Sequence, residues 1–280
     1  MSADAEGAVD IPPKYLYKYL DRYGLDAVAN LELKVTPPDE FNDPFEFCPA
    51  IEKSKEEDAA YRAYLTALLT ENGKDPTNAP DEDWVRQMSF ARPLIQKAAA
   101  KAAATAGLRI ACFSASAKLI TQWSYYSDGH HGIVMEIDTS NLQKKSEADE
   151  IWWWQKIDYQ ARKPQPIFQG FLKDYSGDSS LLTKIIANIA AEKSPQWKSE
   201  CEWRLVLKSN RVRSRISNGR VLYFLPIEKV AIRRVILGIK ASKEFEREIR
   251  KAVQSVDLPD DLIMRAEPDY ERRMVRIPNP

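Results

Sequence analysis

The chain lacks the short motifs that mark several large enzyme classes. Its 280 residues contain no G-x-G-x-x-G, no Walker A loop, no H-E-x-x-H and no G-x-S-x-G. These absences argue against a Rossmann dehydrogenase, a P-loop NTPase, a zincin protease and an α/β-hydrolase.

Cysteine and histidine are also scarce, with three and two residues respectively. The cysteines, Cys48, Cys112 and Cys201, are widely spaced and form no C-x-x-C. This argues against a Cys/His zinc site, so no metal site is predicted from these residues, and it is typical of reduced cytosolic thiols. Cys112 and Cys201 stand in apolar, strand-like patterns, which predicts buried thiols rather than nucleophiles.

Net charge is absent too, because 41 basic residues balance 41 acidic ones. A globally basic nucleic-acid binder is therefore not expected, although a local basic patch stays open. No apolar run approaches the length of a membrane span, and the first ten residues are acidic and lack the apolar segment of a signal peptide. We expect a cytoplasmic protein with no membrane partner.

What is present is a series of short strand patterns with helical patterns between some of them. This predicts an α+β fold: a mixed, largely antiparallel sheet of short strands with flanking helices. Residues 1–14 and 271–280 are expected to be tails, and 15–270 one domain with a helical insertion at 52–106. Strands are expected at 15–19, 33–35, 109–114, 132–138, 157–159, 200–207, 220–225, 235–238 and 262–266. Helices are expected at 25–31, 52–72, 81–106 (broken or kinked at Pro93), 119–126, 181–191 and 243–253.

The segment E-C-E-W-R-L-V-L from Glu200 is the most informative part of the chain. Written as a strand, it places Glu200, Glu202, Arg204 and Val206 on one face, and Cys201, Trp203, Leu205 and Leu207 on the other. The second face is apolar and anchors the strand. The first carries three charges in five residues, which suits either a binding site or an exposed salt-bridged surface.

The segment F-N-D-P-F-E, residues 41–46, predicts a turn, because Asn and Asp side chains bond to nearby backbone and Pro restricts the chain. Two flanking phenylalanines, Phe41 and Phe45, are expected to anchor it in the core. It is either a rigid corner or a loop that presents Asn42, Asp43 and Glu46 at the rim of a cleft.

The segment Q-W-S-Y-Y-S-D-G-H-H-G, residues 122–132, places Trp123 and Tyr126 on one helix face. They suit either a core or a stacking platform. His131 suits either a structural role or phosphate binding and proton transfer. The run Trp152–Trp154 predicts at least one indole that is exposed or covers a loop, packed there or stacked on a base or nicotinamide.

Taken together, L-Y-K-Y, F-N-D-P-F-E, C-F-S, W-S-Y-Y-S-D-G-H-H-G-I-V-M-E-I-D, E-C-E-W-R-L and V-I-L-G resemble the bacterial domain-of-unknown-function family 2971. The resemblance spans roughly residues 15–240. Tyr125 departs from it, because the family often has histidine there, as in W-S-H-Y. The resemblance marks a site without implying a reaction.

The layout is also similar to that of ADP-ribosyltransferase folds. By this analogy Tyr17 or Lys18 contacts NAD, Glu202 or Glu200 holds a ribose hydroxyl and stabilises an oxocarbenium-like state, and Tyr126 or Trp123 stacks on the nicotinamide. We therefore expect a nucleotide- or NAD-using transferase, in a toxin or phage-defence context. NAD would be its co-substrate, and a nucleic-acid end or a partner protein a further ligand.

Two alternatives stay open at this point. One is a non-catalytic module that senses a nucleotide-like small molecule or binds a protein. The other is a nuclease that holds Mg²⁺ with Asp43, Glu46, Glu200 and Glu202, since carboxylates are suitable hard ligands. The residues expected in one shared cleft are Tyr17, Lys18, Asn42, Asp43, Glu46, Ser114, Trp123, Tyr126, His131, Glu200, Glu202 and Arg204. Of these, Glu202, Glu200, Arg204 and His131 are the expected catalytic residues.

Overall fold

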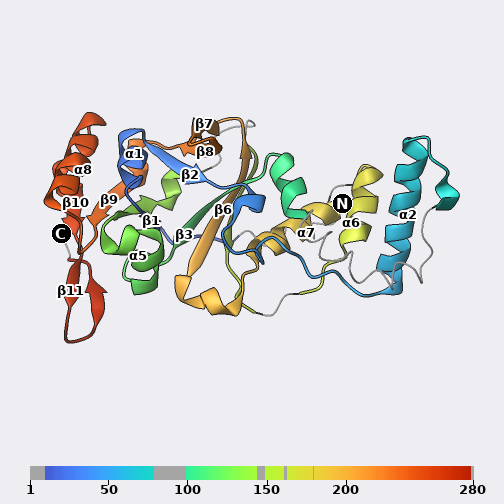
Figure 1. Cartoon of the computed structure of the whole chain (residues 1–280), viewed down its shortest axis with the longest axis horizontal. Coiled ribbons are helices and arrows are strands. Elements are labelled where there is room, and N and C mark those ends of the chain that lie inside the picture. Colours follow the sequence, from blue (N-terminus) through green and yellow to red (C-terminus); the bar gives the residue numbers. More distant parts are fainter. Residues whose placement is uncertain (1–9, 79–98, 144–148, 161–162, 179, 279–280) are drawn as a thin grey trace. The chain divides into compact units, whose positions relative to one another are not determined.

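The computed structural model describes residues 10–78, 99–143, 149–160, 163–178 and 180–278. The described chain forms two compact units. One contains residues 38–106 and 158–195, and the other contains 10–37, 107–157 and 196–280. Figure 1 shows the helices and strands of both units, coloured along the sequence.

Among the described residues, the larger unit is built on a seven-stranded sheet in which five of the six strand pairs are antiparallel and the β10–β9 pair is parallel. In spatial order its strands are β10 (Ile263–Arg265), β9 (Ile232–Leu237), β4 (Ile133–Asp138), β1 (Tyr15–Leu20), β3 (Arg109–Ser114), β6 (Glu202–Ser209) and β5 (Asp149–Lys156). This confirms the α+β class and the largely antiparallel sheet.

In its described residues, two smaller sheets and three helices complete this unit. The second sheet has the order β2 (Glu32–Val35), β8 (Arg220–Pro226) and β7 (Arg213–Ser217), and β11 (Glu267–Asp269) pairs with β12 (Met274–Arg276). The helices are α1 (Gly24–Ala29), α5 (Ile120–Tyr126) and α8 (Lys243–Ser255). Short 3-10 turns are η3 (Asp128–His130), η4 (Thr139–Asn141), η5 (Pro195–Glu200), η6 (Lys229–Ala231) and η7 (Asp260–Leu262).

The two faces of the main sheet carry different chemistry. One face joins α1, α8 and the second sheet in a large apolar core that includes Leu16, Phe113, Leu205, Leu225 and Ile249. The other face has a smaller apolar cluster around Tyr19, Trp123 and Val134. Strand residues alternate between these two faces. The face that carries the large apolar core is called the core face below, and the opposite face is called the polar face.

The smaller unit is helical. Its described elements are η1 (Pro38–Glu40), α2 (Lys55–Glu71), η2 (Pro76–Asn78), a helical segment at 99–105, α6 (Ile167–Tyr175) and α7 (Ser180–Ala191). Ser54 begins α2 by accepting a hydrogen bond from the Glu57 amide at 3.1 Å. The buried Glu57 carboxylate in turn accepts the Phe168 amide at 2.5 Å and so satisfies the free N–H groups at the start of α6.

Most expected elements are present, and several expectations are wrong. Residues 157–159 form no strand, because β5 ends at Lys156 and Asp158 makes only an isolated bridge. Cys201 is exposed and Cys112 partly buried, so neither is the buried thiol expected. Phe45 is 64% exposed, and Phe47 stacks on Phe41 in its place. Of the helix expected at 81–106, residues 99–105 are helical, and 81–98 with Pro93 lie outside the described residues.

Candidate functional site

A row of polar side chains crosses the centre of the main sheet on its polar face. Tyr17 of β1 stands opposite Glu136 of β4 on one side and Ser114 of β3 on the other. Ser114 stands opposite Glu202 of β6, and Glu136 opposite Arg234 of β9. Directly opposed residues of antiparallel strands share a face. Five adjacent strands therefore present one continuous row, Arg234–Glu136–Tyr17–Ser114–Glu202, called the polar row below.

Glu202 is held in place by an arginine on its own strand. The Arg204 Nε lies 2.7 Å from Glu202 Oε1, and the two residues are 0% and 4% exposed. Taking both charges out of water costs several kcal/mol per ion, and their attraction offsets this only in good geometry. Apolar residues would stabilise the same strand at least as well. A buried pair in this place is therefore weak as a fold stabiliser and well suited to fix a carboxylate for a ligand.

Glu200 reaches the same region from outside the strand. It ends η5, and Cys201 then adopts a left-handed φ of 49°, so β6 begins at Glu202 rather than at Glu200 as the sequence suggested. The Tyr126 hydroxyl donates to Glu200 Oε1 at 2.9 Å, and the Ser114 hydroxyl donates to the Glu200 carbonyl at 2.8 Å. The turn thus adds a second buried carboxylate beside the polar row.

The other end of the polar row is an ion pair with a tyrosine. Arg234 Nε lies 3.1 Å from Glu136 Oε2, and the Tyr17 hydroxyl lies 3.5 Å from Glu136 Oε1. Burial first, and then the Glu136 charge, raise the pKa of Tyr17 above its usual value. Tyr17 therefore stays protonated at neutral pH and acts as a hydrogen-bond donor.

Trp153 is a member of this region that the sequence did not single out as a site residue. It pairs with Val206 across β5 and β6, which places its indole on the polar face, on the strand next to that of Arg204. Its Nε1 is buried and has no hydrogen-bond partner among the described residues. A buried N–H without a partner is uncommon and marks a position for a water or a ligand oxygen. The unusual three-tryptophan run was the available signal.

Lys18 lies on the opposite side of the sheet from Tyr17. Leu16 and Leu20, its neighbours on the same face, pack on the core face. The Lys18 ammonium donates to the Cys112 carbonyl at 2.8 Å and lies 5.5 Å from the centre of the Phe113 ring. Of the two alternatives proposed from sequence for the first strand, only Tyr17 joins the polar row.

Burial lowers the pKa of Lys18, so its charge costs stability at neutral pH. A Lys18→Met variant is expected to be about 1 kcal/mol more stable than the wild type at pH 7. Above the lowered pKa the unfolded chain binds more protons than the folded chain, so wild-type stability rises with pH up to the unfolded pKa of about 10.4. The wild type should therefore regain stability relative to the variant between pH 7 and pH 10.

Urea unfolding at several pH values measures this difference. The exposed Lys243→Met is the matched control, and it should give no pH-dependent gain. A Lys18→Met variant that is less stable at pH 7 would show that the ammonium contacts outweigh the cost of burial.

Trp123 is a structural anchor of the polar face. It is 0% exposed, donates from Nε1 to the Ala117 carbonyl at 2.8 Å, and contacts Tyr19 edge-on at 5.4 Å between ring centres. The His130 ring stacks on it at 5.9 Å. Burial, followed by the nearby Lys240 charge, lowers the pKa of His130, which favours a neutral ring. Of the two aromatic residues expected at the site, Tyr126 contacts a site carboxylate, that of Glu200, through its hydroxyl, whereas Trp123 is part of the packing.

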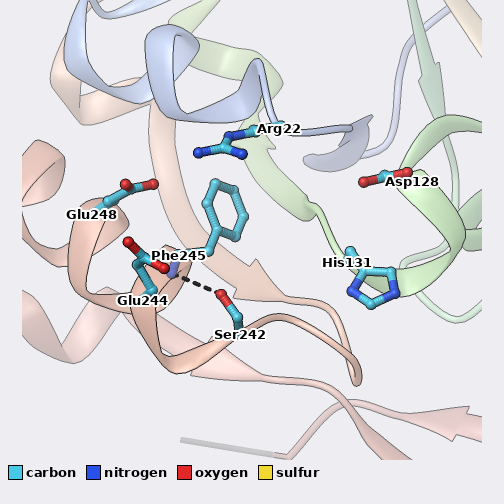
Figure 2. Close-up of a pocket in the computed structure, with 7 residues that line it drawn as sticks. All are labelled: Arg22, Asp128, His131, Ser242, Glu244, Phe245 and Glu248. Carbon is cyan, nitrogen blue, oxygen red and sulfur yellow. Dashed lines mark hydrogen bonds between the residues drawn. The ribbon is translucent and has the colours of Figure 1, made fainter.

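His131 lines a separate pocket near the start of β4, two residues before its first residue, Ile133. Figure 2 shows His131 and Asp128 on one loop, facing Ser242 and the first turns of α8, with Arg22 above them. The pocket has a volume of about 180 Å³. Glu136 is three residues beyond the first residue of β4, roughly 10 Å along the strand. The structure thus groups His131 with Arg22 and Asp128 rather than with the polar row.

Asn42, Asp43 and Glu46 belong to the smaller unit. Asp43 is buried and accepts the Phe45 amide at 2.9 Å, which confirms the predicted turn, and Asn42 is exposed. Glu46 Oε1 lies 3.0 Å from the Lys193 ammonium, and both side chains are almost fully buried. Both members of this second buried ion pair belong to the smaller unit.

Two further features concern the whole described chain. No group of three or more His, Cys, Asp or Glu side chains is placed to hold a metal ion within the described ranges. None of the helices in those ranges is long and apolar enough to cross a membrane.

Fold and site together define an α+β protein whose central sheet carries a row of buried and partly buried ionisable and hydroxyl side chains. Over residues 122–205 the chain resembles the family described as "Protein of unknown function (DUF2971)". The matched segment runs from Gln122 to Leu205 and includes Tyr126, Glu200, Glu202 and Arg204. No curated protein and no solved structure matches the chain.

Proposed function

We propose that the chain is an NAD-using enzyme that transfers ADP-ribose, with the polar row as its site and Glu202 as its central carboxylate. The observation that carries this proposal is the register across three strands: Tyr17, Ser114 and Glu202 stand directly opposite one another. This row supplies a phenol donor, a hydroxyl and an oriented carboxylate on one face, which are the groups that a ribose ring needs for recognition.

The proposed reaction depends on the fixed orientation of the Glu202 carboxylate. The glycosidic bond between ribose C1′ and the nicotinamide nitrogen breaks, and its electron pair neutralises the pyridinium ring. An acceptor oxygen or nitrogen forms the new bond to C1′ and releases its proton to solvent. Glu202, held by Arg204 at 2.7 Å, accepts a hydrogen bond from a ribose hydroxyl and stabilises the positive charge that develops on the sugar.

A Glu202→Gln variant tests the proposal. Glutamine keeps the shape and an acceptor for Arg204 but removes the negative charge, so NAD turnover is expected to fall by about 100-fold or more. Turnover is measured as nicotinamide release in the presence of protein and nucleic-acid acceptors. The matched control is Glu32→Gln, because Glu32 is also buried and paired with an arginine, Arg215, but lies in the second sheet. It should retain wild-type turnover.

Equal turnover in Glu202→Gln and the wild type would overturn the catalytic role. If the wild-type protein releases no nicotinamide but its melting temperature rises with NAD concentration, the chain is a nucleotide-binding module and not an enzyme. Loss of activity in a chelator would instead favour the magnesium-dependent alternative.

A further inference from the structure

The second sheet has two chemically different faces. Leu33, Val35 and Leu225 point into the large apolar core. The alternate positions of the three strands point the other way. Four basic residues occupy that outer side: Lys34 of β2, Arg213 and Arg215 of β7, and Arg220 of β8. All four are exposed, and they form what is called the basic face below.

The charge of this face is concentrated although the whole chain is neutral. The sequence has no Asp or Glu between Lys208 and Ile227. Arg215 pairs with the buried carboxylate of Glu32. In the part of the chain that the structure describes, no carboxylate forms an ion pair with Lys34, Arg213 or Arg220. Arg213 also lies within electrostatic reach of the Glu32 carboxyl, so four positive charges share this side with one buried carboxylate, and a net positive charge is available to an external anion.

An aromatic ring lies between these charges. Phe224 stands opposite Lys34 on one side and Arg213 on the other. The Arg215 guanidinium lies over the same ring, 4.1 Å from its centre. Cationic side chains interleaved with an aromatic ring form the kind of surface that contacts nucleic acids, because phosphates bind the charges and bases stack on the ring.

The shape of the sheet edge also favours this partner. β7 and β8 are joined by Asn218 and Gly219, whose φ angles of 50° and 75° belong to the tight turn of a two-residue hairpin. At the turn, Ile216 is 80% exposed. β7 is an edge strand of the second sheet and β8 its central strand, and Figure 1 shows both at the top of the view. From Arg220 to Leu222, β8 pairs with β7 alone, and a two-stranded ribbon of this kind fits the major groove of a duplex.

We propose that the basic face binds the phosphodiester backbone of a nucleic acid. Guanidinium groups recognise phosphate by paired hydrogen bonds, which fits the predominance of arginine over lysine at these positions. The inference does not depend on the proposed enzyme activity, because the basic face and the polar row lie on different sheets. The two proposals can therefore fail separately.

The experiment measures fluorescence anisotropy of a labelled 20-nucleotide DNA, single-stranded and duplex, at several salt concentrations. Three phosphate contacts predict a slope of log K against log salt of about −3 for the duplex and about −2 for the single strand. The triple variant Lys34→Gln/Arg213→Gln/Arg220→Gln should bind at least tenfold more weakly and lose most of this slope. Arg215 is left unchanged so that Glu32 keeps its partner.

The matched control removes the same charge elsewhere. Arg233, Arg247 and Arg272 are exposed and lie outside the second sheet, so replacing all three by Gln should leave binding within about twofold. If the triple variant does not fold, Arg220→Gln alone should reduce the slope by about one. Three results would overturn the proposal: no DNA binding at 50 mM salt, equal loss in the control, or equally tight binding of polyglutamate. The last would indicate an acidic protein partner.

Discussion

Replacing Gly238 with alanine is expected to destabilise the larger unit by about 3 kcal/mol or more, the upper range for overpacking. An added Cβ would lie 2.1 Å from the His130 carbonyl oxygen and 3.1 Å from that of Gly132. Both neighbours are backbone atoms that cannot rotate away. They are also hydrogen-bonded in place, because the Gly238 amide donates to the Gly132 carbonyl at 2.9 Å and the Lys240 amide to that of His130 at 3.0 Å.

The matched control for this change is Gly129→Ala, in the 128–132 loop that Gly238 contacts. Gly129 has nothing within 4 Å of an added Cβ, and only its left-handed φ of 56° opposes alanine, so the expected cost is about 1 kcal/mol. Urea unfolding followed by circular dichroism compares the two variants. If Gly238→Ala costs no more than Gly129→Ala, the close approach of β9 to the His130–Gly132 loop is not as tight as the structure has it.

Replacing Arg204 with methionine is expected to cost about 3–5 kcal/mol, as for the loss of one partner from a buried ion pair. Arg204 is among the largest fully buried side chains, and its removal leaves Glu202 buried without the guanidinium 2.7 Å away. Methionine fills much of the same space, so the loss is mainly electrostatic. Unfolding by urea at pH 7 measures it.

The double variant Glu202→Met/Arg204→Met is the control. It removes both charges and is expected to recover most of the lost stability, since apolar replacement of a whole buried pair is often neutral or stabilising. A double variant as unstable as the single one would show that packing, and not charge, accounts for the loss. With Glu202→Met measured as well, the cycle gives the coupling energy between Glu202 and Arg204.

The sequence predicted the strands and helices best where the pattern was strong and local. β1, β3, β4 and β9 and the helices α2, α7 and α8 lie close to their expected positions. It missed α6, which starts directly after Pro166, and it missed β7, β11 and β12. β7 consists mainly of exposed polar residues, so no alternation of apolar side chains marked it. Its pairing with β8 decides its conformation.

The face of β6 was predicted in part. Glu202 and Arg204 do share a face opposite to Trp203 and Leu205, as alternation requires. The wrong part was Glu200, because the left-handed Cys201 breaks the alternation before the strand begins. Such a backbone conformation depends on contacts with distant chain, here the Ala115 amide that donates to the Cys201 carbonyl at 2.9 Å.

By itself, then, the sequence determined the α+β class, the two-faced strand at Glu202 and the absence of several well-known site motifs, because periodicity and composition are local properties. Only the tertiary structure decided which residues meet. Turns outside the strands bring His131 and Arg22 to one pocket. Strand register places Ser114 between Tyr17 and Glu202 and puts Lys18 on the far side of the sheet. Register is set by long-range pairing and core packing, and a shift of one residue would turn every one of these side chains to the opposite face.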